Sequence, residues 1–401
     1  MQTSIQKAGV YAPGPPEQMS ESARKLRNAY AMKPGAPFFH CEFRFYSLAA
    51  WQEQGMPQDM LPPDADLHVF EAYYLLADLL DYDPPAHYLL RQLGWSEPAF
   101  APAFEVKLIE DRGKYEVVQD FAGRKAIYPK GRSNGSMPGY LDFPVKDKKT
   151  WVKNVKWRLD PKTPERYVDL ATRMEEAQAA AARGMVIVQN LIGGYMYLNS
   201  LMGPERLLYA FYDMPDLIHD CMRTWLALAN AVVARHQEYV TIDQLILAED
   251  ICHRRGPLIS FEMMKEFLFP YYQQLIANIK SRQLDRQRHL YVQIDSDGFA
   301  VPIIPFYKEA IGMDVMGPFE VTEGGDVVEI GRQHPDLVIF GGIDNRVLAR
   351  NKEAIDAHLE YILPIMRERG GYIPTCGHGV LAEVPYENYL YYRKRCLELG
   401  G

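Results

Sequence analysis

Cysteine is sparse in this 401-residue sequence, and no two cysteines stand close together. There are five, an odd number with no CxxC or comparable spacing, at Cys41, Cys221, Cys252, Cys376 and Cys396. This spacing argues against a disulfide framework and against a zinc finger, and it fits a reducing, cytoplasmic environment.

Long apolar runs are also missing. The first twenty residues lack the apolar stretch of a secretory signal, and nowhere do about 18 apolar residues follow one another. We therefore expect a protein that neither spans a membrane nor is exported by a signal peptide. A net charge of −8 would repel nucleic acid and anionic lipid, and the phosphate-binding patterns GxGxxG and GxxxxGKS/T are absent. Small-molecule chemistry is the favoured function class.

What the sequence does have is a globular composition, with 48% hydrophobic and 24% charged residues. Its length suits one large barrel with insertions, which needs roughly 250 residues or more. Residues 1–21, rich in Pro, Gly, Ser and Gln, predict a flexible arm, and residues 22–401 predict a single domain. Within it, the proline-rich stretch at about 50–160 is interpreted as a cap or insertion. A hairpin is expected there, pairing residues 104–110 with residues 115–120.

From residue 163 onward, short apolar runs alternate with longer segments of helical period. Each run has the length and continuous apolar character of a buried parallel strand. The runs are Met185–Asn190, Gln244–Glu249, His289–Ile294, Met313–Met316, Leu337–Phe340 and Tyr372–Pro374. Repeated βα units of this kind predict an α/β fold, a closed (β/α)8 TIM barrel with the insertion lying over its mouth.

The C-terminal third of the chain resembles one protein superfamily. Residues 377–388 read GHGVLAEVPYEN and are similar to the GHGxLPxTPxEN signature near the end of uroporphyrinogen decarboxylases. Further segments resemble the same superfamily in matching order: Glu249–Asp250, Gly256–Ser260, Asp295–Gly298, Gly317–Glu320 and Gly341–Asp344. The resemblance implies a TIM barrel of the uroporphyrinogen decarboxylase type. That superfamily also contains zinc-dependent methyltransferases that exchange methyl groups with corrinoid proteins or thiols, so a shared fold leaves the reaction open.

Two departures from the family patterns bear on the reaction. Uroporphyrinogen decarboxylases carry an arginine-rich segment that grips the carboxylates of the substrate, whereas residues 38–46 here contain one arginine, Arg44, and an acidic residue. The zinc methyltransferases carry an H-x-C pair and a later cysteine. The resemblance places Asp295 and Asp297 at that pair and His378 at the later cysteine.

The thiolate ligands are thus replaced, but carboxylate and imidazole are both competent zinc ligands. The candidate metal set is His378, Glu320 and Asp295 or Asp297, with Cys376 as an alternative ligand. Three of these residues, His378, Glu320 and Asp297, are also the candidate catalytic residues, because TIM barrels place their chemistry just beyond the strands. Each has a plainer alternative: a helix cap for one aspartate, an exposed loop carboxylate for Glu320, and a structural histidine.

Five residues at strand ends or in the following loops are candidates for substrate binding: Arg44, Asn190, Tyr195, Glu249 and His253. Glu249 and Asp250 are adjacent, so only one of them can face the barrel mouth. Ion pairing with Arg254 or Arg255 is the alternative for that pair. For Cys376, a buried thiol that acts as a small hydrophobic residue is the plainer interpretation.

The leading hypothesis for function is a methyltransferase subunit that removes the O-methyl group of a methoxylated aromatic and transfers it to a corrinoid protein. An ether oxygen leaves poorly unless its developing charge is neutralised, which zinc or a proton donor at the site would do. The sequence shows no corrinoid-binding domain, so a partner protein is expected to bring that cofactor. A cofactor-free decarboxylase is the alternative, and whether the chain forms a homodimer stays open.

Overall fold

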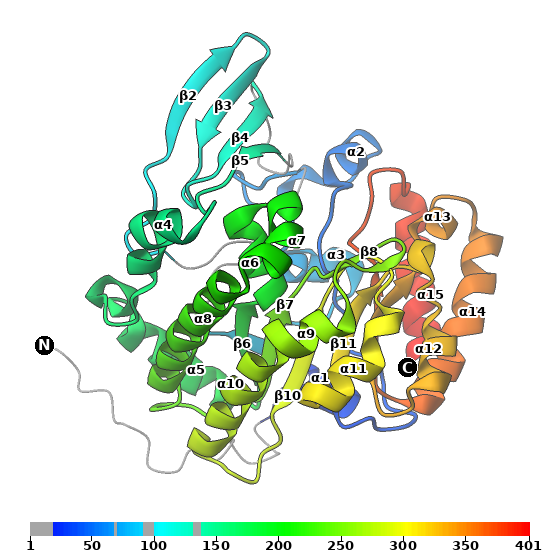
Figure 1. Ribbon diagram of the computed structural model, residues 1–401. Coiled ribbons are helices and arrows are strands. Elements are labelled where there is room, and N and C mark those ends of the chain that lie inside the picture. Colours follow the sequence, from blue (N-terminus) through cyan, green and yellow to red (C-terminus); the bar gives the residue numbers. More distant parts are fainter. Residues whose placement is uncertain (1–18, 68–69, 91–99, 131–137) are drawn as a thin grey trace, which may run out of the picture.

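The computed structural model describes residues 19–67, 70–90, 100–130 and 138–401 (Figure 1). Nearly all of the predicted N-terminal arm lies outside these residues. The central element is a curled parallel sheet of seven strands in the order β1-β6-β7-β10-β11-β12-β13. Its strands are β1 (His87–Leu89), β6 (Val186–Ile192), β7 (Gln244–Ala248), β10 (Tyr291–Asp295), β11 (Val315–Phe319), β12 (Val338–Ile343) and β13 (Tyr372–Cys376). The predicted α/β fold of TIM-barrel type is confirmed.

Six of these strands coincide with the six apolar runs predicted from the sequence, with ends displaced by a few residues. Where the prediction requires an eighth strand, residues 38–42 run between β13 and β1 without ladder pairing. The Asp83 amide donates to the His40 carbonyl at 2.9 Å, and the Cys376 amide donates to a Glu42 carboxylate oxygen at 3.3 Å. This segment therefore fills the gap between the first and last strands.

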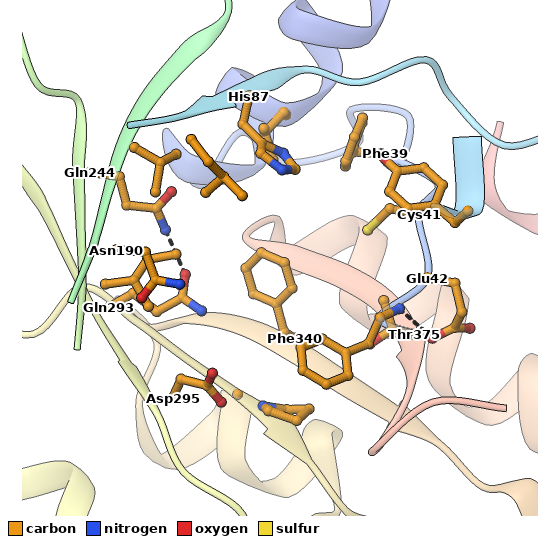
Figure 2. A pocket seen from close by; sticks show the side chains of 18 of the residues that line it. Phe39, Cys41, Glu42, His87, Asn190, Gln244, Gln293, Asp295, Phe340 and Thr375 are labelled. Atoms are coloured by element: carbon orange, nitrogen blue, oxygen red, sulfur yellow. Dashed lines mark hydrogen bonds between the residues drawn. The ribbon is translucent and has the colours of Figure 1, made fainter. Parts of the chain in front are cut away.

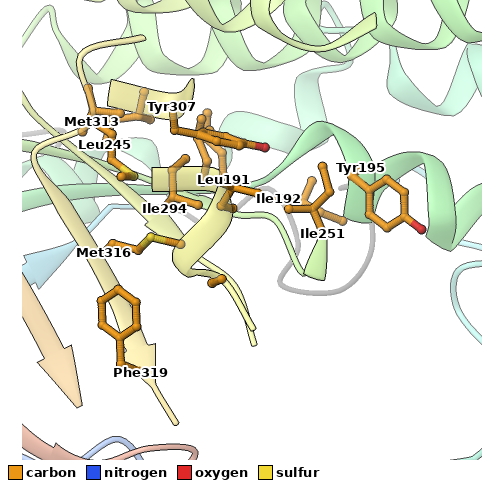
Figure 3. Packing of buried hydrophobic residues seen from close by; sticks show 14 of the residues in the cluster. Leu191, Ile192, Tyr195, Leu245, Ile251, Ile294, Tyr307, Met313, Met316 and Phe319 are labelled. Atoms are coloured by element: carbon orange, nitrogen blue, oxygen red, sulfur yellow. The ribbon is translucent and has the colours of Figure 1, made fainter. Parts of the chain in front are cut away.

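Helices cover the outer face of the sheet (Figure 1). Side chains that alternate along the strands pack against them in one large buried cluster, which includes Leu191, Leu245, Ile294 and Met316 (Figure 3). The covering helices are α5 (Leu170–Ala182), α6 (Gly194–Met202), α7 (Pro204–Asp213), α8 (Pro215–His236), α9 (Phe261–Phe267), α10 (Phe269–Arg282), α11 (Ile304–Ile311), α12 (Val327–Gln333), α13 (Asn345–Leu348), α14 (Lys352–Arg369) and α15 (Tyr386–Gly400). The other side of the sheet faces the barrel interior, because successive side chains of a strand point to opposite faces.

One short helix closes the amino-terminal end of the barrel. Helix α1 (Glu21–Tyr30) begins at Ser20, whose hydroxyl accepts a hydrogen bond from the Ala23 amide. Arg27 donates to the carbonyls of Gly184 and Met185, just before β6 begins. Since α1 covers this end, access to the barrel interior is from the carboxyl ends of the strands.

The stretch between α1 and α5 contains the short helices α2 (Leu48–Glu53), α3 (Ala77–Leu80) and α4 (Lys148–Thr150), and a four-stranded antiparallel sheet. The sheet consists of β2 (Lys107–Arg112), β3 (Tyr115–Gln119), β4 (Lys125–Pro129) and β5 (Gly139–Asp142), and it projects away from α6 and α7 (Figure 1). The predicted hairpin is confirmed as β2 and β3, although β2 runs from Lys107 to Arg112, where the prediction had residues 104–110. The division into an arm and one domain with a cap stays a prediction.

Within the part of the chain that the structure describes, no helix combines the length and the apolarity needed to cross a bilayer.

Candidate active site

Three of the predicted site residues meet at the carboxyl ends of the strands. Asp297 follows β10, Glu320 follows β11 and His378 follows β13. One ligand atom from each, a carboxylate oxygen or an imidazole nitrogen, lies within 4.8 Å of the other two. Parallel strands bring residues that are far apart in sequence to one edge of the sheet, and here they produce a compact acidic and imidazole group.

His378 is held by a carboxylate and by aromatic rings. Its Nδ1 lies 3.0 Å from an Asp297 carboxylate oxygen, and this hydrogen bond raises the pKa of the imidazole, against the opposing effect of burial. The imidazole ring contacts Phe43 at 5.9 Å between centroids and stacks on Tyr46 at 6.4 Å. These contacts orient the histidine toward its carboxylate partner.

The glycine after His378 allows this loop to approach the opposite segment. Gly379 has φ +104°, and a Cβ there would lie 2.6 Å from the Arg44 carbonyl oxygen. The next amide, of Val380, donates to that same carbonyl at 2.8 Å. The glycine of the GHG motif thus allows the backbone after His378 to lie against the backbone of Arg44, and this contact fixes the position of the histidine.

Two further carboxyl groups lie beneath this group. Asp295 ends β10 and is 8% exposed, and burial, reinforced by Asp250 and Asp297, raises its pKa well above the ordinary value. Burial also raises the pKa of Asp250 to about 6, and its carboxylate accepts a hydrogen bond from the Asp297 amide. Asp250 has φ +42°, a left-handed conformation that is uncommon outside glycine. Asp250 is therefore a site residue that the sequence prediction did not select.

A cavity of about 410 Å³ extends from this region into the barrel (Figure 2). Asn190, Gln244, Gln293 and Asp295 form one side of it, and Phe39 and Phe340 face them from the other side. Further lining residues are Leu26, Tyr30, Cys41, Glu42, Phe43, Arg44, Glu71, Tyr73, His87, Leu89, Val188, Ile246, Gly317, Pro318 and Thr375. The predictions that Arg44 and Asn190 line a pocket agree with this geometry.

Arg44 lies at the open end of the cavity. One guanidinium nitrogen lies 3.3 Å from a Glu71 carboxylate oxygen, another donates to the Tyr46 hydroxyl at 3.1 Å, and the guanidinium stacks on the Phe43 ring at 4.4 Å. Glu71 is 63% exposed, which locates this end at the protein surface. The charge of Arg44 is therefore partly neutralised before any substrate binds.

Two predicted substrate-binding residues, Glu249 and Tyr195, lie outside the cavity. Glu249 is fully buried on the helix side of the sheet and accepts hydrogen bonds from the Tyr272 hydroxyl at 2.7 Å and the Tyr307 hydroxyl at 3.0 Å. Tyr195 is 2% exposed in the same region, where its amide donates to Glu249. The structure therefore places neither residue at the cavity. Of the adjacent pair Glu249 and Asp250, Asp250 turns toward the site, and the substrate-binding role of Glu249 and Tyr195 stays a prediction.

Three other predictions also need correction. His253 is exposed on the short strand β8 (Cys252–His253) and is not among the cavity's lining residues. Cys376 is fully buried beside Glu42, which agrees with the plainer interpretation and not with a metal ligand. Asp295 points into the cavity and does not belong to the group formed by Asp297, Glu320 and His378. Of the two candidate aspartates, only the one beyond the strand end reaches that group.

The burial of Glu249 has a measurable consequence for stability. Burial raises its pKa to about 7, so between about pH 4.5 and 7 the folded protein holds a proton that the unfolded chain has lost. This contribution to stability is present at low pH and is lost as the pH rises through 7. We expect Glu249→Gln, which cannot ionise, to lose less stability over this range, by up to ~3 kcal/mol. Urea unfolding at a series of pH values measures this, and equal pH slopes for the two proteins would contradict the assignment.

Asp297, Glu320 and His378 have the chemistry and spacing of a metal site. Zinc is bound by carboxylate oxygen and imidazole nitrogen at ~2 Å, so ligand atoms on one ion stand roughly 3–4 Å apart. The separations of up to 4.8 Å come close to this requirement and would need only small side-chain adjustments. The side chains of Asp297 and His378 are 39% and 35% exposed, which leaves room for a further ligand from solution. The three residues therefore fit a zinc ion with an open coordination position.

Comparison with known proteins points to one family. A sequence profile of the uroporphyrinogen decarboxylase (URO-D) family matches residues 158–396. The uroporphyrinogen decarboxylase of Geobacter metallireducens is 27% identical over 199 residues, which cover 47% of this chain and 50% of that protein. The protein of the same name from Chlamydia trachomatis is 36% identical over 89 residues, covering 21% of this chain and 26% of the relative. The chain thus spans about half the length, or less, of these curated relatives.

Among solved structures, a methyltransferase from Methanosarcina mazei superposes with a TM-score of 0.55 at 11% sequence identity. The superposition covers 93% of this chain and 98% of the methyltransferase. At this level of identity the likeness concerns the fold, and it extends over nearly the whole of both chains.

Proposed function

The chain belongs to the uroporphyrinogen decarboxylase family, and from that premise we propose that it is a methyltransferase subunit that demethylates a methoxylated aromatic compound. The observation that carries the proposal is the group formed by Asp297, Glu320 and His378, which lies next to the cavity: His378 contacts Phe43, one of the residues that line it. The group supplies charge-neutralising chemistry at the leaving oxygen, and the cavity supplies space for the rest of the substrate.

We assign zinc to this group, with Asp297, Glu320 and His378 as its ligands. When bound, zinc supplies a Lewis acid that neutralises charge on the ether oxygen that leaves. The protein's own residues position the reactants. The aromatic rings of Phe43 and Tyr46 hold His378 in place, and the Asp295 carboxyl borders the cavity. Such fixed groups act on the transition state without reorganising during the reaction.

We propose that a corrinoid protein, and not this chain, carries the methyl acceptor. In its reduced form the corrinoid supplies the nucleophile that takes the methyl group. The exposure of the Asp297 and His378 side chains places the group where the cofactor of a docked partner can approach it. Such a transfer requires a reducing environment, so we place the protein in the cytoplasm, where its five free cysteines are also stable.

A decarboxylase is the second candidate, favoured by the relatives' names and by the Asp297–His378 pair, which could deliver a proton to a carbanion. The interior of the barrel argues against a substrate with many carboxylates. Arg44 is the one arginine or lysine among the described residues that line the cavity, and it is already paired with Glu71. A decarboxylase on this scaffold would therefore need a substrate with little negative charge.

Two measurements on the purified protein distinguish these functions. We expect one zinc per chain, and methylation of a reduced corrinoid protein when a methoxylated aromatic is added, followed by cobalt absorbance. Release of carbon dioxide from a pyrrole or aromatic acid without any corrinoid protein, together with no cobalt methylation across a broad panel of methoxylated aromatics, would favour the decarboxylase.

A further inference from the structure

Two carboxamides lie at one level inside the barrel. Asn190 of β6 and Gln293 of β10 both pair in register with Ile246 of β7, which lies between them. Both side chains line the cavity, and Figure 2 shows them on the same wall. Asp295 is two residues further along β10, so it lies ~7 Å nearer the carboxyl end. This wall therefore carries polar groups at two depths, with Asn190 and Gln293 deeper and Asp295 nearer the carboxyl end. The two depths are separated by about the width of one substituted ring.

A chain of hydrogen bonds fixes the orientation of the deeper level. The Tyr30 hydroxyl donates to Gln244 Oε1 at 2.9 Å, and Gln244 Nε2 donates to Gln293 Oε1 at 2.5 Å. Gln293 Nε2 and the Asn190 carboxamide have no hydrogen-bond partner among the residues that the structure describes. Both side chains are half-buried and open to the cavity, so their free amide groups can bond to a polar group of a ligand or to water there.

The opposite wall carries the aromatic rings of Phe39 and Phe340, with Glu42 and Thr375 beside them. Phe39 is 1% exposed, and Phe340 projects toward the centre of the cavity in Figure 2. The volume of about 410 Å³ lies in the range of small-molecule sites. One flat ring with small substituents therefore suits the shape and polarity of the two walls.

The charges in the cavity select against an acid. Arg44, the one lysine or arginine among the described lining residues, is at the open end, and the groups nearer the interior, including the Glu42 and Asp295 carboxyl groups, supply no positive charge to balance an anion. A carboxylate at the level of Asn190 and Gln293 would be desolvated without a counter-charge. A phenolic hydroxyl both donates and accepts a hydrogen bond, as a carboxamide does, and it carries no charge to desolvate.

We propose that the barrel interior is the binding site for an uncharged methoxyphenol, whose hydroxyl group bonds to Asn190 and Gln293. The ring packs against Phe39 and Phe340, and the methoxy group points past Asp295 toward Asp297, Glu320 and His378. This inference rests on the proposed methyltransferase function, because it takes the methoxy group as the reacting end. It adds to that function the position of the substrate, which lies inside the barrel at the level of Asn190 and Gln293, and the exclusion of carboxylated substrates.

Calorimetric titration of the purified chain with three probes tests the proposal: 4-methoxyphenol, 4-methoxybenzoate and methoxybenzene. We expect 4-methoxyphenol to bind most tightly. Gln293→Leu should weaken 4-methoxyphenol about tenfold and leave methoxybenzene nearly unchanged, because one hydrogen bond is lost and the ring contacts remain. Asn190→Leu should act in the same direction. The control is Gln333→Leu, an exposed glutamine on α12, which should not change binding of any probe.

Three binding results would overturn the proposal. The first is tighter binding of 4-methoxybenzoate, which would place a carboxylate at Arg44, whose buried Nε has no partner among the described residues. The second is an equal effect of Gln293→Leu on 4-methoxyphenol and methoxybenzene, and the third is no binding of any probe. Because binding needs no corrinoid protein, tight 4-methoxyphenol binding without methyl transfer would contradict the proposed function alone. Methyl transfer from 4-methoxybenzoate but not from 4-methoxyphenol would contradict this inference alone.

Discussion

Replacing His378 with alanine is expected to reduce methyl transfer on the order of 1000-fold, the scale found when one group that stabilises a developing negative charge is removed. The imidazole is one of three groups in the candidate metal site, and it alone supplies a nitrogen ligand. Its loss should also lower the zinc content of the purified protein. The fold should persist, because His378 lies in a partly exposed loop and its ring contributes little to the core.

His289→Ala is the matched control, since His289 is 55% exposed beside Asp314 at the amino-terminal end of β10. It should retain full activity and full zinc content. Arg44→Gln provides a second comparison. In a methyltransferase, Arg44→Gln should mainly raise KM, because a contact that is equally strong in the bound substrate and in the transition state does not lower the chemical barrier. A decarboxylase in which Arg44 binds the substrate carboxylate would instead lose most of its kcat. Unchanged activity in His378→Ala would remove the histidine from the mechanism.

Gly193→Ala is expected to cause the largest loss of stability, about 3 kcal/mol or more, because the substitution overpacks a rigid part of the core. A Cβ at Gly193 would lie 1.7 Å from Glu249 Oε2 and 2.8 Å from the Ala248 carbonyl oxygen. The backbone contact cannot be relieved by rotating a side chain, and the Gly193 amide bonds to that same carbonyl at 2.6 Å. The end of β6 would have to separate from the end of β7.

Gly139→Ala in β5 is the control for this substitution, because its added Cβ would meet one side-chain methyl, of Ile127, at 3.0 Å. Urea unfolding of both variants gives the difference in the free energy of unfolding. Equal stability of Gly193→Ala and the parent protein would show that the strand ends are less closely packed than the structure indicates.

The fold could be predicted from the sequence because parallel strands that are covered on both sides leave continuous apolar runs. Strand β1 escaped detection because His87–Leu89 spans three residues, too few to show any period. Residues 38–42 fill the eighth position through individual hydrogen bonds and side-chain packing, and such contacts leave no repeating pattern in a sequence.

The candidate site was predicted less completely than the fold. His378, Asp297 and Glu320 each follow a predicted strand, so their meeting follows from the barrel. Glu249 was chosen over Asp250 although the sequence could not decide between them. Adjacent residues of a strand point to opposite faces of the sheet, and the sequence does not show which of the two points toward the barrel interior. That choice depends on the left-handed backbone at Asp250 and on the hydroxyls of Tyr272 and Tyr307, which come from distant helices. The polar interior was missed because Gln244 and Gln293 lie inside runs that read as apolar strands.

The transfer of an intact methyl group to a corrinoid is the central claim, and isotopic labelling tests it most directly. The purified protein is mixed with a reduced corrinoid protein and 4-methoxyphenol whose methyl group carries three deuterium atoms. Mass spectrometry should find the labelled methyl group on cobalt, with hydroquinone released in equal amount. Labelled methyl that stays on the methoxy oxygen of 4-methoxyphenol, while the same protein releases carbon dioxide from a pyrrole or aromatic acid, would contradict the account.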